Sequence, residues 1–172
     1  MNETLKNILE WILRPIIKKP TPTPTHPQLC LDLLKSHNEE RSKYGAQNLT
    51  LDQRLITTAE LHAKWMSDNR NMSHTGNKRS SPQSRITDQH YIATYSGENV
   101  AYGYTSIAEV MHGWMTSPGH RFNILSRSYK NCGFGSYKNY WCTVFGTESK
   151  NNQIFIGHYS SGPLKNYKQS DS

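Results

Sequence analysis

Two early stretches of the chain carry apolar residues at the spacing of an amphipathic helix. The first runs from about residue 28 to Tyr44, and Gly45 is a stop signal directly behind it. The second runs from Asp52 to about Asp68, and its apolar side carries Leu55, Ala59, Ala63 and Trp65. We expect both helices to cover one face of a sheet.

Residues 70–97 are polar, basic and rich in Ser, Asn and Gln, which predicts a long surface loop or a series of turns. A third helix should follow Ser106, because Glu109 stands three residues later, as in a capping box. A short fourth helix should begin at Ser117-Pro118, with serine as N-cap and proline at the first helical position.

Strand composition dominates the end of the chain, at residues 131–136, 140–146 and 153–159. Turn residues separate these stretches at Lys138-Asn139 and at residues 149–152, so an antiparallel meander is predicted. Helices that come early and strands that come late place the chain in the α+β class.

The N-terminal region differs from the rest. Residues 5–17 are apolar but contain Glu10, Arg14 and Pro15, which excludes a membrane span of about 20 apolar residues. The same stretch lacks the features of a clear signal peptide. It is either an amphipathic helix that docks on a membrane or partner, or a poorly ordered tail. We divide the chain into this segment (1–18), a Pro/Thr-rich extended linker (19–28) and one globular domain (29–172).

The net charge of the chain excludes few classes of binding partner. The net charge of +7 favours association with anionic partners, but the basic residues are scattered. The chain has neither a Gly-rich phosphate loop nor an aromatic-interleaved RNA motif, so we do not expect nucleic-acid binding.

The three cysteines, Cys30, Cys132 and Cys142, are too few for a four-thiolate zinc site. Cys132 and Cys142 flank the predicted hairpin, and a disulfide would form if the register placed them opposite each other. Two buried, reduced thiols are an equally good interpretation.

Several motifs, taken in order, resemble the CAP superfamily, named for cysteine-rich secretory proteins, antigen 5 and pathogenesis-related 1 proteins. The similarity covers roughly residues 30–146 and is closest to the short, microbial-type members. The motifs are His37-Asn-Glu-Glu-Arg41 with Tyr44-Gly45, Leu51-Asp52 with Leu55 and Ala59, Met72-Ser-His74, Gly97-Glu-Asn-Val-Ala-Tyr-Gly103, Trp114, Ser117-Pro-Gly-His-Arg-Phe-Asn-Ile-Leu125, and Gly133-Phe-Gly135 with Tyr140-Trp141.

The resemblance implies a three-layer α-β-α sandwich around a central antiparallel sheet, with a cleft where His74, Glu98 and His120 converge. In the longer plant and animal forms a second glutamate lies three residues after the helix tryptophan, whereas Ser117 occupies that position here. Two imidazoles and one carboxylate suit zinc or a similar divalent cation, with an open position for water. Ser117 is expected to cap its helix and, together with Asn99 and Asn123, to support the cleft.

The function that the resemblance implies is a non-enzymatic binding module whose groove takes a lipid, a peptide or a protein ligand. The alternative is a hydrolase that uses the same cleft, either through a metal-bound water or through Ser117 and His120. The resemblance also implies an extracellular location, and residues 5–17 suggest contact with a membrane surface. Trp114 and Trp141 are expected in the core, and His62, His112 and His158 are expected to be structural or exposed.

Overall fold

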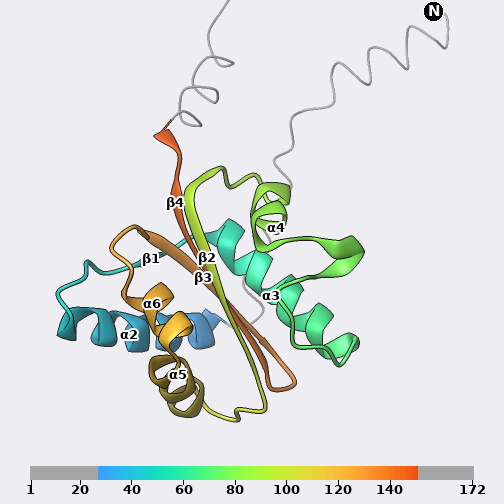
Figure 1. The fold of residues 1–172 in the computed structure, drawn as a ribbon, viewed down its shortest axis with the longest axis horizontal. Coiled ribbons are helices and arrows are strands. Elements are labelled where there is room, and N and C mark those ends of the chain that lie inside the picture. The colour runs from blue at the N-terminus through green and yellow to red at the C-terminus, as the bar shows by residue number, and fades with distance from the viewer. Residues whose placement is uncertain (1–26, 151–172) are drawn as a thin grey trace, which may run out of the picture.

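The computed structural model describes residues 27–150 (Figure 1). Residues 1–18, most of the predicted linker and the predicted strand 153–159, with His158, lie outside this range. The elements in chain order are α2 (Pro27–Lys43), β1 (Thr50–Leu51), α3 (Gln53–Asp68), the 3₁₀ turn η1 (Asn77–Arg79), α4 (Pro82–Asp88), β2 (Ala93–Tyr102), α5 (Ile107–Thr116), α6 (Pro118–Leu125), β3 (Asn131–Tyr137) and β4 (Tyr140–Glu148).

The four strands form one sheet in the order β1-β3-β4-β2. β4 pairs antiparallel with β3, as the predicted meander requires. It also pairs antiparallel with β2, which was not among the strands predicted from the sequence. The sheet is mixed, however, because the two-residue strand β1 runs parallel to β3, which corrects the expectation of a purely antiparallel sheet. β2 is an edge strand, and this position puts the candidate site at the rim of the sheet.

The β3–β4 hairpin turns where the sequence predicts. Lys138 and Asn139 both have positive φ, 46° and 63°, and Tyr137 pairs with Tyr140 across the turn. Two consecutive positive φ angles match the right-handed twist of a two-residue hairpin.

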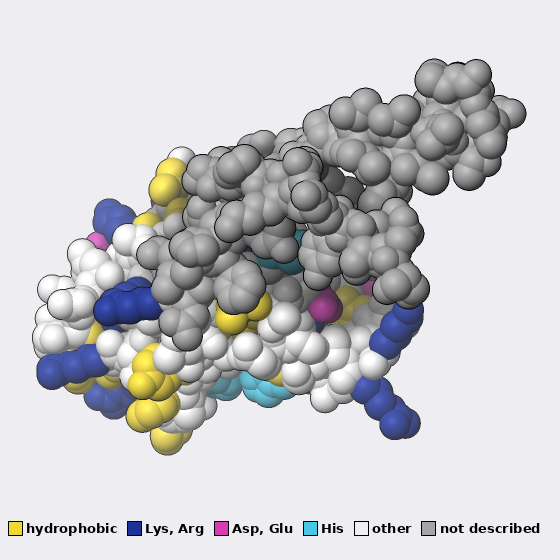
Figure 2. Space-filling view, turned by 90° about the horizontal axis from the view of Figure 1, so that it is seen from above, with side chains coloured by type: hydrophobic (Ala, Val, Ile, Leu, Met, Phe, Trp, Pro, Cys, Tyr) yellow, Lys and Arg dark blue, Asp and Glu magenta, His cyan; other side chains and the backbone are white. Residues whose placement is uncertain are grey.

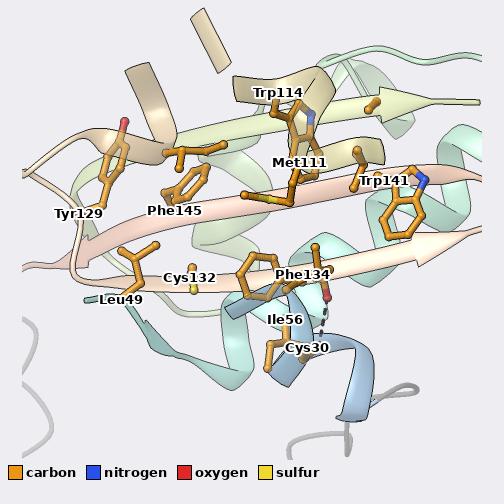
Figure 3. Packing of buried hydrophobic residues seen from close by; sticks show 14 residues of the cluster. Cys30, Leu49, Ile56, Met111, Trp114, Tyr129, Cys132, Phe134, Trp141 and Phe145 are labelled. Carbon is orange, nitrogen blue, oxygen red and sulfur yellow. Dashed lines mark hydrogen bonds between the residues drawn. The ribbon is translucent and has the colours of Figure 1, made fainter. Parts of the chain in front are cut away.

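Helices cover both faces of the sheet (Figure 1). α2, α5 and α6 pack on one face around Trp114, Phe134 and Phe145 (Figure 3). α3 and α4 pack on the other face around Met66 and Ile86. The expectation that α2 and α3 share a face is therefore wrong, whereas the three-layer arrangement is confirmed. Trp114 and Trp141 are buried in the first layer, as predicted.

The backbone of α3 lies directly on β3. A Cβ atom at Gly133 would stand 2.0 Å from the backbone of Leu55, and one at Gly135 would stand 2.4 Å from the backbone of Ala59. The Gly133-Phe-Gly135 motif is thus required by the close approach of a helix, with Phe134 filling the opposite face of the sheet.

The cysteines are all free thiols. Cys132 pairs with Phe145 in the register, and Cys142 pairs with Gly135. Because side chains alternate across a strand, Cys132 points into the α2 layer and Cys142 into the α3 layer. The disulfide alternative is therefore excluded by the register.

The segment 70–97 is more ordered than the loop predicted for it. It contains η1 and α4, and β2 begins at Ala93. α4 starts with Ser81 and Pro82, and the side chains of Ser81 and Ser84 form a reciprocal capping box. The same Ser-Pro signal that identifies the helix at residue 117 was therefore present at residue 81.

Other helix boundaries fall where the sequence places them. Gly45, behind α2, has a φ of 65°, and the Asp52 side chain accepts a hydrogen bond from the Arg54 amide at the start of α3. At the start of α5, the Ser106 hydroxyl accepts a hydrogen bond from the Glu109 amide. No helix within residues 27–150 is both long and apolar enough to cross a membrane.

His37 makes the stability of this fold dependent on pH. The ring is buried, its Nδ1–H donates to the Leu33 carbonyl at 2.8 Å, and it packs against Phe134. Burial, helped by the charge of Arg41, lowers its pKa from 6.5 to about 4. Between these values the unfolded chain binds a proton that the folded chain does not, so stability should fall by about 3 kcal/mol as pH drops from about 6.5 to 4.

The expected result is tested by urea unfolding at several pH values with the full chain and with His37→Asn. The variant should be less stable at pH 7 and should lose less stability on acidification. The exposed His112→Asn serves as the control. An unchanged pH slope in His37→Asn would contradict the assignment.

Candidate functional site

Two neighbouring side chains of the edge strand β2 point to opposite faces of the sheet. Glu98 pairs with Val144 and points into the α3/α4 layer, and Asn99 pairs with Thr143 and points toward α6. The strand alternation thereby splits the Gly-Glu-Asn motif between two layers. The site is built around this split.

Glu98 is the centre of the cluster, and its side chain is only 1% exposed. Arg85 Nη2 donates to its Oε2 at 2.6 Å, and His74 Nδ1 lies 2.9 Å from its Oε1. His62 Nε2 stands 3.9 Å from the same Oε1, and the Cys142 thiol contacts Oε2 at 3.7 Å. Both carboxylate oxygens are therefore engaged by side chains of this domain.

The ionisation of the cluster follows from these contacts. Burial alone would raise the pKa of Glu98, but the hydrogen bond from His74 and the charges of Arg85 and His62 hold it below its ordinary value. The bond to Glu98 in turn raises the pKa of His74. Burial lowers the pKa of His62. The buried carboxylate is thus stabilised in its charged form.

His120 completes the candidate set from the other side of the β2 edge. It lies on α6, and burial together with the charge of His74 lowers its pKa. The His74 side chain is 54% exposed, so one ring of the pair opens to solvent. Figure 2 shows histidine side chains on the molecular surface, at the lower margin of the face in view and beside hydrophobic side chains.

Asn99 and Asn123 hold α6 against β2. Asn99 Nδ2 donates to the His120 carbonyl at 3.0 Å, and Asn123 Nδ2 donates to Asn99 Oδ1 at 2.9 Å. The outer carbonyls of β2 accept hydrogen bonds from side chains: Ser96 from Tyr129 Oη, Glu98 from Asn123, and Val100 from Trp114 Nε1. These contacts occupy the open edge of the sheet and position His120.

Ser117 behaves differently from the expectation. It is the N-cap residue of α6 by backbone conformation, but its side chain makes no capping hydrogen bond. The prediction that its hydroxyl is occupied by capping is therefore wrong. Within the described chain, its hydroxyl has no hydrogen bond to His120 either, so the two side chains do not form a nucleophile–base pair.

Sequence reasoning missed Arg85 and misjudged the setting of His62. Arg85 lies on the undetected helix α4, so the Ser-Pro start signal at residue 81 would have revealed it. His62 is structural, as expected, but it lies in the polar cluster. Its place on the face of α3 that also carries Ala59 and Met66 indicated burial. His112 is exposed, as expected.

The three expected metal ligands do not form a direct three-ligand site. No group of three or more His, Cys, Asp or Glu side chains between residues 27 and 150 is arranged to hold a metal ion. Arg85 and His74 each form a hydrogen bond with one oxygen of the Glu98 carboxylate. Glu98 fits a supporting role, since carboxylates commonly orient a histidine ligand through Nδ1.

Solved structures share this architecture. An extracellular protein with an SCP domain from Bacillus anthracis str. Ames superposes with a TM-score of 0.67 at 26% identity, over 69% of this chain and 40% of that one. An outer surface protein from Borrelia burgdorferi superposes with a TM-score of 0.62 at 23% identity, over 69% of this chain and 92% of that one, and shows the fold alone.

Two curated proteins of Bacillus subtilis (strain 168) are also similar. The uncharacterized membrane protein YlbC is 32% identical over 113 residues, or 66% of this chain and 33% of YlbC. The uncharacterized protein YkwD is 33% identical over 98 residues, or 57% of this chain and 38% of YkwD. The chain thus spans about a third of the length of YlbC and 38% of that of YkwD. The model of the CAP family, described as the cysteine-rich secretory protein family, matches residues 34–159, and the chain belongs to this family.

Proposed function

We propose that this CAP domain is a non-enzymatic binding module, and that its binding surface is a cleft beside β2, between His74 and His120. The observation that carries the proposal is the state of Glu98. Its buried carboxylate is held by Arg85 at 2.6 Å and by His74 at 2.9 Å, so it serves as an anchor rather than as a free base. The cleft then offers two imidazoles on a rigid support.

These imidazoles are the side chains that would hold a divalent cation. When His74 donates its Nδ1 proton to Glu98, its Nε2 remains as the candidate ligand atom. The lowered pKa of His120 keeps that ring neutral and able to bind a metal. A zinc ion held there would offer open positions to the carboxylate of a peptide or the phosphate of a lipid.

Zinc binding by the full chain tests this proposal. We expect calorimetry with zinc chloride to show one site, which the double variant His74→Ala, His120→Ala loses. Affinity should rise with pH, because His74 must give up a proton that Glu98 stabilises. The exposed His112→Ala is the matched control. Equal zinc binding by the double variant would overturn the cation assignment.

The hydrolase alternative has less support from this geometry. A metal-bound water would need a free base, and Glu98 already accepts from two donors. The Ser117 route needs a hydrogen bond from the hydroxyl to a base, and none joins Ser117 to His120 in the described part of the chain. Binding without chemistry therefore remains our proposal.

The comparisons support a location at or outside the cell surface. One similar structure is of an extracellular protein, and one similar curated protein is called a membrane protein. We infer that this domain meets its lipid, peptide or protein ligand in that setting. The membrane contact predicted for residues 5–17 falls outside the described residues and stays a prediction.

A further inference from the structure

A second hollow, of about 670 Å³, lies in the α3/α4 layer, bounded by α3, η1 and α4. His62 and Arg85, which both contact Glu98 from this layer, also line it. It is separate from the cleft proposed for the cation, because neither His74 nor His120 lines it. Three kinds of group converge there: unsatisfied polar atoms, an aromatic wall and a basic rim.

The polar atoms come from His62 and Arg85. His62 Nε2 donates to the Ser73 carbonyl at 2.8 Å, which leaves Nδ1 as a hydrogen-bond acceptor. Within residues 27–150 this Nδ1 is buried without a partner, and so is the donor Nε of Arg85. Buried polar groups normally find partners. A hydroxyl group is both donor and acceptor, so hydroxyls could satisfy the two atoms.

The chain leaves room beside these two side chains. Gly76 passes so close that a Cβ atom there would stand 3.0 Å from Arg85 Nη1 and 3.3 Å from His62 Nδ1. A side chain at this position would crowd both groups. Glycine at this position therefore leaves the two buried groups uncrowded.

The wall is apolar and partly exposed. The Trp65 indole lies parallel to the His62 ring, with an interplanar angle of 7° and a centroid distance of 5.8 Å. Leu61 lies on the same helix and is 56% exposed. An aromatic plane next to hydrogen-bonding groups suits the apolar face of a sugar ring.

The rim is basic. Lys78 and Arg79 are exposed and form no ion pair within the described residues. Both hold left-handed backbone, with φ of 50° and 60°, a conformation that costs free energy in residues other than glycine. Asp88 is the only acidic side chain among the lining residues of the described chain, and the charge of Arg85 is already balanced by Glu98. The two free cations favour an anionic group.

We propose that this hollow binds an anionic sugar. The ring lies on Trp65, hydroxyl groups bond to His62 Nδ1 and Arg85 Nε, and a carboxylate or phosphate meets Lys78 and Arg79. The site is independent of the cation cleft, so either can be present without the other.

The test is a titration of the ¹⁵N-labelled full chain, followed by NMR. D-glucuronate and glucose 6-phosphate are the probes, and glucose and inorganic phosphate are the references, all at equal ionic strength. We expect both anionic sugars to shift the Trp65 indole and the amides of residues 77–89. Glucose should bind about tenfold more weakly, because it lacks the charge.

Variants separate the sugar site from general charge effects. Lys78→Ala with Arg79→Ala should weaken binding of both anionic sugars about tenfold, whereas Arg127→Ala with Lys130→Ala, which removes equal charge from exposed positions elsewhere, should not. The His74→Ala, His120→Ala variant should bind the sugars with the same affinity as the wild type, whether or not the wild type binds zinc. The proposal fails if neither sugar shifts Trp65, if inorganic phosphate acts as strongly, or if the rim variant binds normally.

Discussion

Replacement of Arg41 by alanine should destabilise the domain by about 4 kcal/mol or prevent folding. Arg41 is fully buried, and its guanidinium donates to the carbonyls of Gln47 and Ile124 at 2.7 Å and of Ser126 at 2.8 Å. A longer contact, of 3.4 Å, reaches the carbonyl of Tyr129. The Arg41 side chain thus connects α2 to the end of α6 and to the segment that follows it. Its loss leaves several carbonyls without a donor.

Urea unfolding of three variants separates this role from a loss of charge. Arg41→Lys keeps the charge but lacks the planar fork, so it should recover only a minor part of the stability. Lys43→Ala removes an exposed cation from the same helix and should unfold at nearly the same urea concentration as the wild type. If Arg41→Ala unfolds at the same urea concentration as Lys43→Ala, the hydrogen bonds of Arg41 do not stabilise the domain as proposed.

Glu98→Gln should cost about 3 kcal/mol, because it breaks a buried ion pair and leaves one charge behind. Arg85, whose side chain is 11% exposed, would keep its charge without the carboxylate at 2.6 Å. The pKa of His74 should fall toward its ordinary value, since the hydrogen bond with Glu98 is what raises it. A single substitution therefore changes both stability and the titration of a neighbouring ring.

The pH dependence of the effect has a definite sign. The folded pKa of Glu98 lies below its ordinary value of 4.5, so its contribution is present above about pH 4.5 and is lost as pH falls through the folded pKa. Stability measured by urea unfolding should thus differ most between wild type and Glu98→Gln near neutral pH. The difference should shrink in acid.

NMR titration of the His74 ring provides the second measurement. The control is Glu39→Gln, which removes an exposed carboxylate that lies 3.9 Å from the Lys35 ammonium. That variant should leave both the stability and the pKa of His74 nearly unchanged. If Glu98→Gln is as stable as the wild type and its His74 has the same pKa as in the wild type, the carboxylate is not the anchor of the cluster.

Much of the local structure was accessible from the sequence. The stop at Gly45, the helix start at Asp52 and the turn at Lys138-Asn139 each depend on contacts within a few residues, and all three were predicted correctly. α4 was missed, although its Ser81-Pro82 signal is equally local. That failure came from reading the polar composition of residues 70–97 as a loop.

Other features depend on how distant segments meet. The sequence predicts α2 and α3 as helices, but only packing decides that they lie on opposite faces of the sheet. The pairing of Cys142 with Gly135, and not with Cys132, is a matter of strand register. A shift of one residue would reverse which face each cysteine meets, and no local preference controls it.

The sequence by itself determined the approximate positions of α2, α3, α5, α6, β3 and β4, the family resemblance and three candidate residues, His74, Glu98 and His120. Only the tertiary structure decided what Glu98 does, because its partners Arg85 and His62 come from helices that are distant in the chain. A carboxylate in a motif is a potential base, ligand or anchor. Its role depends on which charges surround it after burial, since desolvation makes those few contacts dominate its ionisation.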